Sequence, residues 1–241
     1  MRTVVTLLSV LALLAAARAR APLLPVPLAP ELPAAQESHR QATRAALDAA
    51  ARERADVLVD KRRGLPARYR PRDLVAPRVR FLAGVDGDAR LLRRGAARGL
   101  ERMFAAARRD GVRLAGVSGF RSFASQRALF AGYADARGVE NAAHVSARAG
   151  HSEHQTGLAI DIAGADGRCA ASGCFAGTRA ARWLERHAAA HGFVVRYPRG
   201  KEDVTGYAYE PWHLRYVGVA LATEAAASGR TLDELLRTRR G

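Results

Sequence analysis

A polar turn runs directly into an apolar strand in the stretch Ser152-Glu153-His154-Gln155-Thr156-Gly157-Leu158-Ala159-Ile160-Asp161. Successive side chains of a strand alternate between its two faces, so the branched apolar residues of 158–162 share one face and Asp161 lies on the other. Gly157 permits a turn that brings His154 beside that carboxylate. The stretch therefore predicts a strand with a core face and, on its opposite face, part of a metal site.

A second cluster, Glu210-Pro211-Trp212-His213, supplies the groups that the first one lacks. Proline has no N–H and interrupts a strand ladder, so we expect a bend that turns Glu210 and His213 into one cleft. His154, Asp161 and His213 would then offer two imidazoles and one carboxylate. Three protein ligands with water in the fourth position are typical of a catalytic zinc site. Glu210 suits the general base that takes a proton from that water.

A third cluster, Ser118-Gly119-Phe120-Arg121-Ser122, lies between a predicted strand and a predicted helix. Ser122 can cap that helix, and Gln126 follows one turn later. The planar guanidinium of Arg121 can hold a carboxylate through two hydrogen bonds or stabilise an oxyanion. This cluster therefore indicates a place for an anionic substrate group.

These three clusters, together with Arg196-Tyr197-Pro198 and Thr205-Gly206-Tyr207, resemble the VanY-type D-alanyl-D-alanine carboxypeptidase family over residues 90–237. That family belongs to the LAS superfamily of zinc metallopeptidases, named for lysostaphin, D-Ala-D-Ala peptidases and hedgehog. The resemblance implies one Zn²⁺ ion held by His154, Asp161 and His213, with Glu210 as the catalytic base. It also implies that Arg121 meets the carboxylate or the oxyanion of the substrate.

The resemblance further implies substrate contacts around the metal centre, by residues at matching motif positions: Gln126, Ser152, Tyr197 and Trp212. The implied activity is removal of the C-terminal D-alanine from peptidoglycan stem peptides. An L,D-carboxypeptidase or a peptidoglycan endopeptidase would use the same chemistry on another bond. A non-catalytic relic that only binds cell-wall peptide is a further alternative, and the intact Glu210 argues against it.

Charge raises one more alternative, a nucleic-acid binder. The 241 residues carry 39 Lys+Arg against 23 Asp+Glu, for a formal charge of +16. Such a balance suits polyanions. However, Lys61 and Lys201 are the only lysines, and arginine together with abundant alanine is typical of a biased genome composition. Aromatic residues, which stack on bases, make up only 6% and gather in the metal motifs, so nucleic acid is not the expected partner. An anionic cell envelope is still an expected partner, through electrostatic association.

The N-terminus has the pattern of a secretory signal over residues 1–21. Arg2 precedes the apolar run of residues 4–17, and small residues follow at the spacing of a cleavage site. An uncleaved N-terminal anchor is the alternative. Export to the periplasm, envelope or exterior fits the two cysteines, Cys169 and Cys174, which can form a disulfide there. A metal-binding pair is the other interpretation, but no second Cys/His pair has the spacing it needs.

The chain divides into the signal, a linking region and a domain. Residues 22–75 combine a proline-rich tether with an Ala/Arg-rich helical segment, and residues 76–241 form the zinc-peptidase domain. Short strands alternate with helices, and no glycine-rich phosphate loop follows a strand, so the sequence favours an α+β domain. We expect a small antiparallel sheet with flanking helices, and the family resemblance implies a LAS/hedgehog-like metallopeptidase domain. We expect strands at 112–117, 158–162, 193–197 and, broken, 207–216. We expect helices at 91–109, 123–137, 178–191, 217–227 and from 231.

Overall fold

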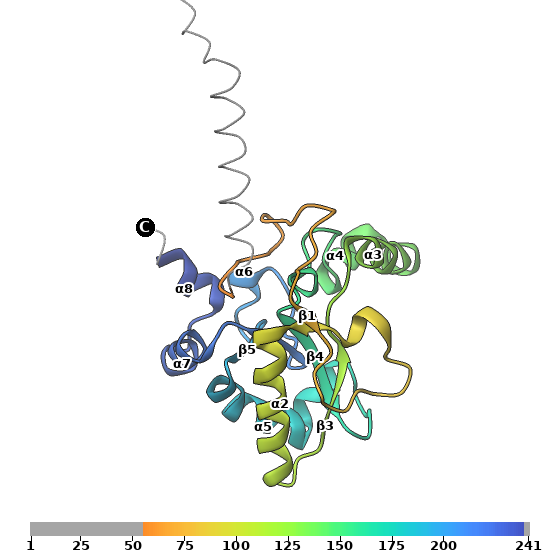
Figure 1. Cartoon of the computed structure of the whole chain (residues 1–241). Coiled ribbons are helices and arrows are strands. Elements are labelled where there is room, and N and C mark those ends of the chain that lie inside the picture. Colours follow the sequence, from red (N-terminus) through yellow and green to blue (C-terminus); the bar gives the residue numbers. More distant parts are fainter. Residues whose placement is uncertain (1–54, 239–241) are drawn as a thin grey trace, which may run out of the picture. The chain divides into compact units, whose positions relative to one another are not determined.

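The structure is a computed structural model and describes residues 55–238 (Figure 1). The predicted signal sequence, the proline-rich tether and most of the helical segment after it lie outside these residues. Within 55–238, no helix is long and apolar enough to cross a membrane.

The domain is built on one antiparallel sheet of four strands in the order β3-β4-β6-β5. Its strands are β3 (Leu114–Ser118), β4 (Ala159–Gly164), β5 (Phe193–Val195) and β6 (His213–Tyr216). A second, two-stranded sheet pairs β1 (Leu74–Val75) with β2 (Leu92–Arg93). This architecture confirms the α+β class expected from the sequence.

The two faces of the central sheet differ in chemistry, as the alternation along β4 predicts. Ile160 and Ile162 are fully buried in the main core, which Leu214 of β6 also joins. Asp161, between the two isoleucines, lies on the opposite face together with His213. One face of the sheet therefore carries the core, and the other carries polar groups at fixed positions.

Helices α2 (Arg94–Arg109) and α5 (Arg179–His187) supply the apolar side chains that pack on the core face. A smaller cluster joins α7 (Val219–Ser228) and α8 (Leu232–Thr238). The other helical segments are α3 (Phe123–Arg137), α4 (Val139–Val145), α6 (Glu202–Thr205) and the 3-10 turns η1 (Gly87–Arg90), η2 (Glu153–Thr156), η3 (Gly173–Gly177) and η4 (Ala188–His191). Figure 1 shows α3 and α4 side by side, away from α7 and α8.

The structure differs from the sequence expectations in several places; for example, Leu92–Arg93, expected at the start of the helix 91–109, form strand β2. Residues 57–75, which precede the predicted domain boundary at residue 76, pack on the domain: Leu58 and Val59 are buried, and β1 pairs with β2. The helix expected to end before Gly138 is followed at once by α4. Gly138, at φ +80°, turns the chain between the two helices; a positive φ of this kind is open to glycine, so one residue ends the first helix and starts the next.

Candidate metal centre and catalytic cleft

Asp161 and His213 are directly opposite each other on β4 and β6, on the polar face of the sheet. The Nδ1 of His213 lies 3.0 Å from Oδ1 of Asp161. Both side chains are buried. The imidazoles beside Asp161 hold the pKa of its carboxyl well below the usual range in spite of that burial. The strand pairing thus places an ionised carboxylate against an imidazole.

His154 reaches the same carboxylate from the turn η2, which Ser152 caps and Gly157 ends at φ +67°. Its Nδ1 lies 2.7 Å from the carbonyl oxygen of Gly119, which can only accept a hydrogen bond, so Nδ1 carries the proton. Its Nε2 is then the unprotonated nitrogen, 3.4 Å from Oδ2 of Asp161. The turn therefore aims one imidazole lone pair at the Asp161 carboxylate.

These three side chains fit a metal ion. One ligand atom each from His154, Asp161 and His213 lies within 4.8 Å of the other two, and all three residues are buried. Two imidazoles and one carboxylate are a donor set that zinc accepts, and a fixed N–H···O=C bond behind a ligand histidine is the usual support for it. The structure brings together the three ligands that the sequence resemblance implied.

Glu210 stands beside this group without belonging to it. The N–H of His213 donates to the carbonyl of Glu210 at 3.1 Å, which closes the bend expected at Pro211. Oε2 of Glu210 lies 4.0 Å from Nδ1 of His213. Burial, together with the charge of Asp161, raises the pKa of Glu210 to about 7. A carboxyl with such a pKa can take and return a proton near neutrality.

Arg121 points toward the cleft from the loop between β3 and α3, where two side chains orient it. Its Nη1 donates to Oε1 of Gln126 at 2.8 Å and its Nη2 to Oγ of Ser118 at 2.9 Å. Gln126 is buried and donates in turn to the carbonyl of Ala147 at 2.7 Å and to Ser146. Gln126 therefore anchors the guanidinium, in addition to lining the cleft.

The residues predicted to bind the metal, to act in catalysis or to contact the substrate all line one cleft of about 240 Å³. Tyr197 stacks on the ring of His213 with 5.1 Å between centroids. Trp212 is half-buried and packs against the main core. The oxygen of Ser152 accepts from the N–H of His154, so that hydroxyl also serves as a cap. The predicted substrate roles of Gln126, Ser152, Tyr197 and Trp212 stay predictions.

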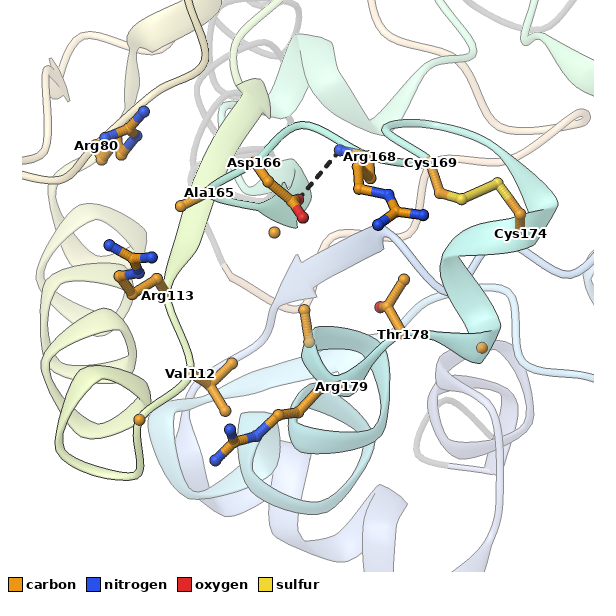
Figure 2. A pocket seen from close by; sticks show the side chains of 14 residues that line it. Arg80, Val112, Arg113, Ala165, Asp166, Arg168, Cys169, Cys174, Thr178 and Arg179 are labelled. Carbon is orange, nitrogen blue, oxygen red and sulfur yellow. Dashed lines mark hydrogen bonds between the residues drawn. A yellow bond between two sulfur atoms is a disulfide. The ribbon is translucent and has the colours of Figure 1, made fainter.

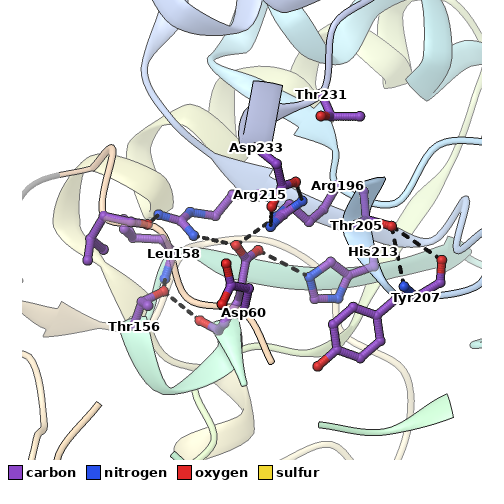
Figure 3. A network of polar contacts seen from close by, with 12 residues as sticks. Asp60, Thr156, Leu158, Arg196, Thr205, Tyr207, His213, Arg215, Thr231 and Asp233 are labelled. Carbon is purple, nitrogen blue, oxygen red and sulfur yellow. Dashed lines mark hydrogen bonds and ion pairs between the residues drawn. The ribbon is translucent and has the colours of Figure 1, made fainter. Parts of the chain in front are cut away.

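A buried ion network behind His213 was missed by the sequence reasoning (Figure 3). Oε1 of Glu153 accepts hydrogen bonds from Arg196 Nε at 2.8 Å and from Arg215 Nη1 at 2.7 Å. Arg196 also bonds the carboxylate of Asp233 on α8. Arg215 follows His213 by two residues on β6, so the two side chains lie on the same face of the strand. This alternation is the sequence signal that places Arg215 near the metal site.

Further residues that line the cleft belong to none of the sequence motifs. They include Leu129 and Tyr133 of α3, Val145 of α4, Tyr207, and Ala171. Ala171 lies inside the loop closed by a disulfide between Cys169 and Cys174, at φ +47°. The small disulfide loop is therefore part of the cleft wall.

Cys169 and Cys174 themselves face a second pocket, of about 700 Å³ (Figure 2). Its lining contains one carboxylate, that of Asp166. It also contains four exposed arginines: Arg80, Arg113, Arg168 and Arg179. The backbone N–H of Arg168 donates a hydrogen bond to Oδ1 of that carboxylate. The pocket is strongly positive and holds none of the groups of the metal centre.

Comparison with known proteins identifies the family. The model of the VanY family, described as D-alanyl-D-alanine carboxypeptidase, matches residues 89–219, more than half of the chain. The YodJ protein of Bacillus subtilis (strain 168) is 42% identical over 177 residues, which are 73% of this chain and 65% of YodJ. A D-alanyl-D-alanine carboxypeptidase of Enterococcus faecalis is 38% identical over 58% of this chain and 53% of its own length. The chain thus spans just over half to two thirds of the length of these curated relatives.

Solved structures give the same result. The LD-carboxypeptidase LdcB has a TM-score of 0.73 and 40% identity, over 77% of this chain and 87% of LdcB. A zinc complex of the vancomycin-resistance D,D-pentapeptidase VanY has a TM-score of 0.61 and 33% identity, over 76% of this chain and 98% of VanY. These similarities include enzymes that are named for two different peptide bonds.

Proposed function

The chain belongs to the VanY family of D-alanyl-D-alanine carboxypeptidases, and we propose that it is an exported zinc carboxypeptidase that removes the C-terminal D-alanine from peptidoglycan stem peptides. One observation carries the proposal. His154, Asp161 and His213 converge in a cleft that also contains Glu210 and Arg121. This is a metal donor set with a base and an anion-binding group around it.

The residues divide the reaction between them. One zinc ion bound by the three ligands would polarise the scissile carbonyl and lower the pKa of water. Glu210 takes a proton from the attacking water and passes it to the leaving amine of D-alanine. Arg121, held by Ser118 and Gln126, binds the terminal carboxylate of the peptide or the oxyanion that forms. A carboxylate bound there restricts cleavage to the end of the chain.

The bond that is cleaved has two candidates. VanY is named for D,D-peptides and supports a D-Ala-D-Ala substrate, as the family name does. The LD-carboxypeptidase LdcB has the larger TM-score and identity of these two solved structures, and this favours the L,D-carboxypeptidase as a second candidate. Both candidates release a C-terminal D-alanine and use the same groups.

Substrate trimming tests the proposal. Purified protein is incubated with muropeptides that end in D-Ala-D-Ala and, separately, with muropeptides that end in a single D-Ala. Released D-alanine is measured with and without a chelator, and after zinc is restored. We expect release from one substrate, its loss with chelator and its return with zinc. No release from either substrate, or release that chelation leaves unchanged, would contradict the proposal.

Export is a proposal of its own, supported by the signal pattern of residues 1–21. Fractionation of cells that express the full chain, followed by N-terminal sequencing, tests it. A mature protein outside the cytoplasm that begins near residue 22 would support a cleaved signal. A full-length protein in the membrane fraction would support the anchor instead, and a cytoplasmic protein would contradict export.

Association with an anionic envelope is the further part of the proposal, and the arginine-lined pocket is its best candidate location. Arg80, Arg113 and Arg168 come from separate segments and lie around one hollow. Charge attraction of this kind weakens with salt. The triple variant with glutamine at these positions should bind isolated cell walls less well than a control in which Arg62, Arg72 and Arg127 are changed. Equal, salt-insensitive binding by both would contradict it.

A further inference from the structure

A pair of buried polar atoms lies behind the proposed metal centre. Oε2 of Glu153 and Nε2 of His213 are buried, and neither has a hydrogen-bond partner among the described residues. The two atoms face each other at 3.6 Å, slightly longer than a hydrogen bond. Buried polar atoms without partners are costly, so a pair of complementary atoms at this distance indicates an interaction that closes by a small shift.

Two arginines fix the Glu153 carboxylate from the other side. Arg196 and Arg215 both bond Oε1, which leaves Oε2 directed at His213. The side chains of all three charged residues are fully buried. Glu153 therefore has one oxygen held by positive charge and one oxygen presented to the imidazole.

The arginines are themselves held at distant parts of the chain. Arg196 bonds Asp233 on α8, at 2.5 and 3.2 Å. Arg215 bonds the backbone carbonyls of Ala55 at 3.0 Å and Val57 at 2.5 Å. The carboxylate that faces His213 is thus supported by both ends of the described domain.

Stability alone is a weak reason for such a network. Buried ion pairs cost desolvation, and apolar residues of similar size often replace them without loss of stability. Orientation of a metal ligand is a stronger reason, because a histidine that binds metal through one nitrogen needs an acceptor for the N–H of the other. His154 already has such an acceptor in the carbonyl of Gly119. His213 needs one at Nε2.

We propose that Glu153 is a positioning residue of the metal centre: its Oε2 accepts the Nε2–H of His213 and so keeps Nδ1 free to bind the metal. This inference rests on the proposed zinc site. Glu153 does not touch the substrate in this role and acts only through His213. The two ligand histidines would then bind through different nitrogens, His154 through Nε2 and His213 through Nδ1.

A pair of variants separates orientation from simple structural support. Glu153→Asp keeps the negative charge between the arginines but is one methylene shorter, so it withdraws from His213. Glu153→Gln removes the charge. The matched controls are Glu101→Asp and Glu101→Gln on α2, where Glu101 bonds the backbone of Arg78 outside the cleft. The readouts are the zinc dissociation constant by chelator competition, the absorption spectrum of the Co²⁺ form, and the melting temperature of the metal-free protein.

We expect Glu153→Asp to weaken zinc binding about 10- to 100-fold and to shift the Co²⁺ spectrum, while the metal-free protein melts near the wild-type temperature. Both controls should match wild type. A Glu153→Asp variant that binds zinc within twofold of wild type, with an unchanged Co²⁺ spectrum, would overturn the inference.

A measurement on wild-type protein keeps the inference testable even if both variants fail to fold. Long-range ¹H–¹⁵N spectra of the zinc-loaded protein report which nitrogen of each histidine carries a proton. We expect a proton on Nε2 of His213 and on Nδ1 of His154. A proton on Nδ1 of His213 would overturn the inference alone, whereas a wild-type protein that binds no zinc would overturn the proposed function.

Discussion

The two sides of the cleft are built in opposite ways. On the sheet side, β4 buries all but one of its residues and β6 buries three of four. On the helical side, α3 buries only Gln126 and α4 only Ala142. Leu129, Val139 and Val145 of these helices are large apolar residues that remain exposed. One cleft thus combines a rigid wall with a lightly packed one.

The difference separates two tasks. Metal ligands and a proton-transfer group must keep their geometry within fractions of an ångström, which buried strands and their hydrogen bonds provide. A wall with few buried contacts opens at a lower free-energy cost and can adjust to a substrate. The apolar side chains exposed on α3 and α4 are available for such contacts. Single substitutions on each side of the cleft test this division.

Glu210→Gln should give the largest effect. It removes the proposed proton acceptor and keeps the shape of the side chain, so we expect kcat to fall about 10²- to 10⁴-fold. Zinc content, measured by elemental analysis, should stay unchanged because the proposed ligands are His154, Asp161 and His213. Retention of full activity would remove Glu210 from the role of base.

Arg215→Met should be the most damaging change for stability. It leaves the buried carboxylate of Glu153 with one guanidinium instead of two, and breaking a buried ion pair costs about 3–5 kcal/mol. Arg70→Met is the control, because Arg70 bonds Asp88 through both Nη1 and Nη2 at an exposed site, where such pairs contribute about 0–1 kcal/mol. Urea unfolding of both variants measures the difference. Equal losses would contradict the contrast between buried and exposed pairs.

Gln126→Leu tests the only residue of α3 that is buried. The change removes the donor to the Ala147 carbonyl and the acceptor for Arg121. Leaving such groups unpaired costs about 1–3 kcal/mol. We also expect KM to rise, because Arg121 loses its support. Asn141→Leu, an exposed amide on α4, is the control and should change the free energy of unfolding far less.

Leu129→Ala should have the smallest effect on stability, under about 0.5 kcal/mol, because the side chain is exposed. The same change at the fully buried Leu100 of α2 should cost about 2–5 kcal/mol. Thermal unfolding compares the two. A large loss at Leu129 would mean that the helical wall is packed more firmly than its exposure indicates.

The sequence predicted the rigid wall better than the adjustable one. Alternation along β4 placed Asp161 opposite the core, and Pro211 indicated the bend that brings Glu210 to His213. Both inferences depend on local geometry, which the order of residues determines. Helix α4 was missed because Gly138 is a normal helix end, and only its structure shows that the chain turns directly into another helix.

Glu153 was missed for a different reason. A glutamate in a polar turn is usually solvated, and its partners Arg196 and Arg215 are far from it in sequence. Alternation along β6 places Arg215 on the face of His213, but only tertiary packing brings Glu153 and Arg196 to it. The spacing of residues therefore indicates one member of this network and not its partners.

The carbonyls of Ala55 and Val57, which accept hydrogen bonds from Arg215, limit where this protein can be joined to segments of its relatives. These two residues precede the segment that the family model matches, yet they complete the network that faces His213. A chimera joined at residue 89 would bring a foreign chain to the place of these acceptors and leave a buried guanidinium short of partners. The natural crossover point for domain exchange therefore lies before residue 55, outside the boundary that similarity alone would set.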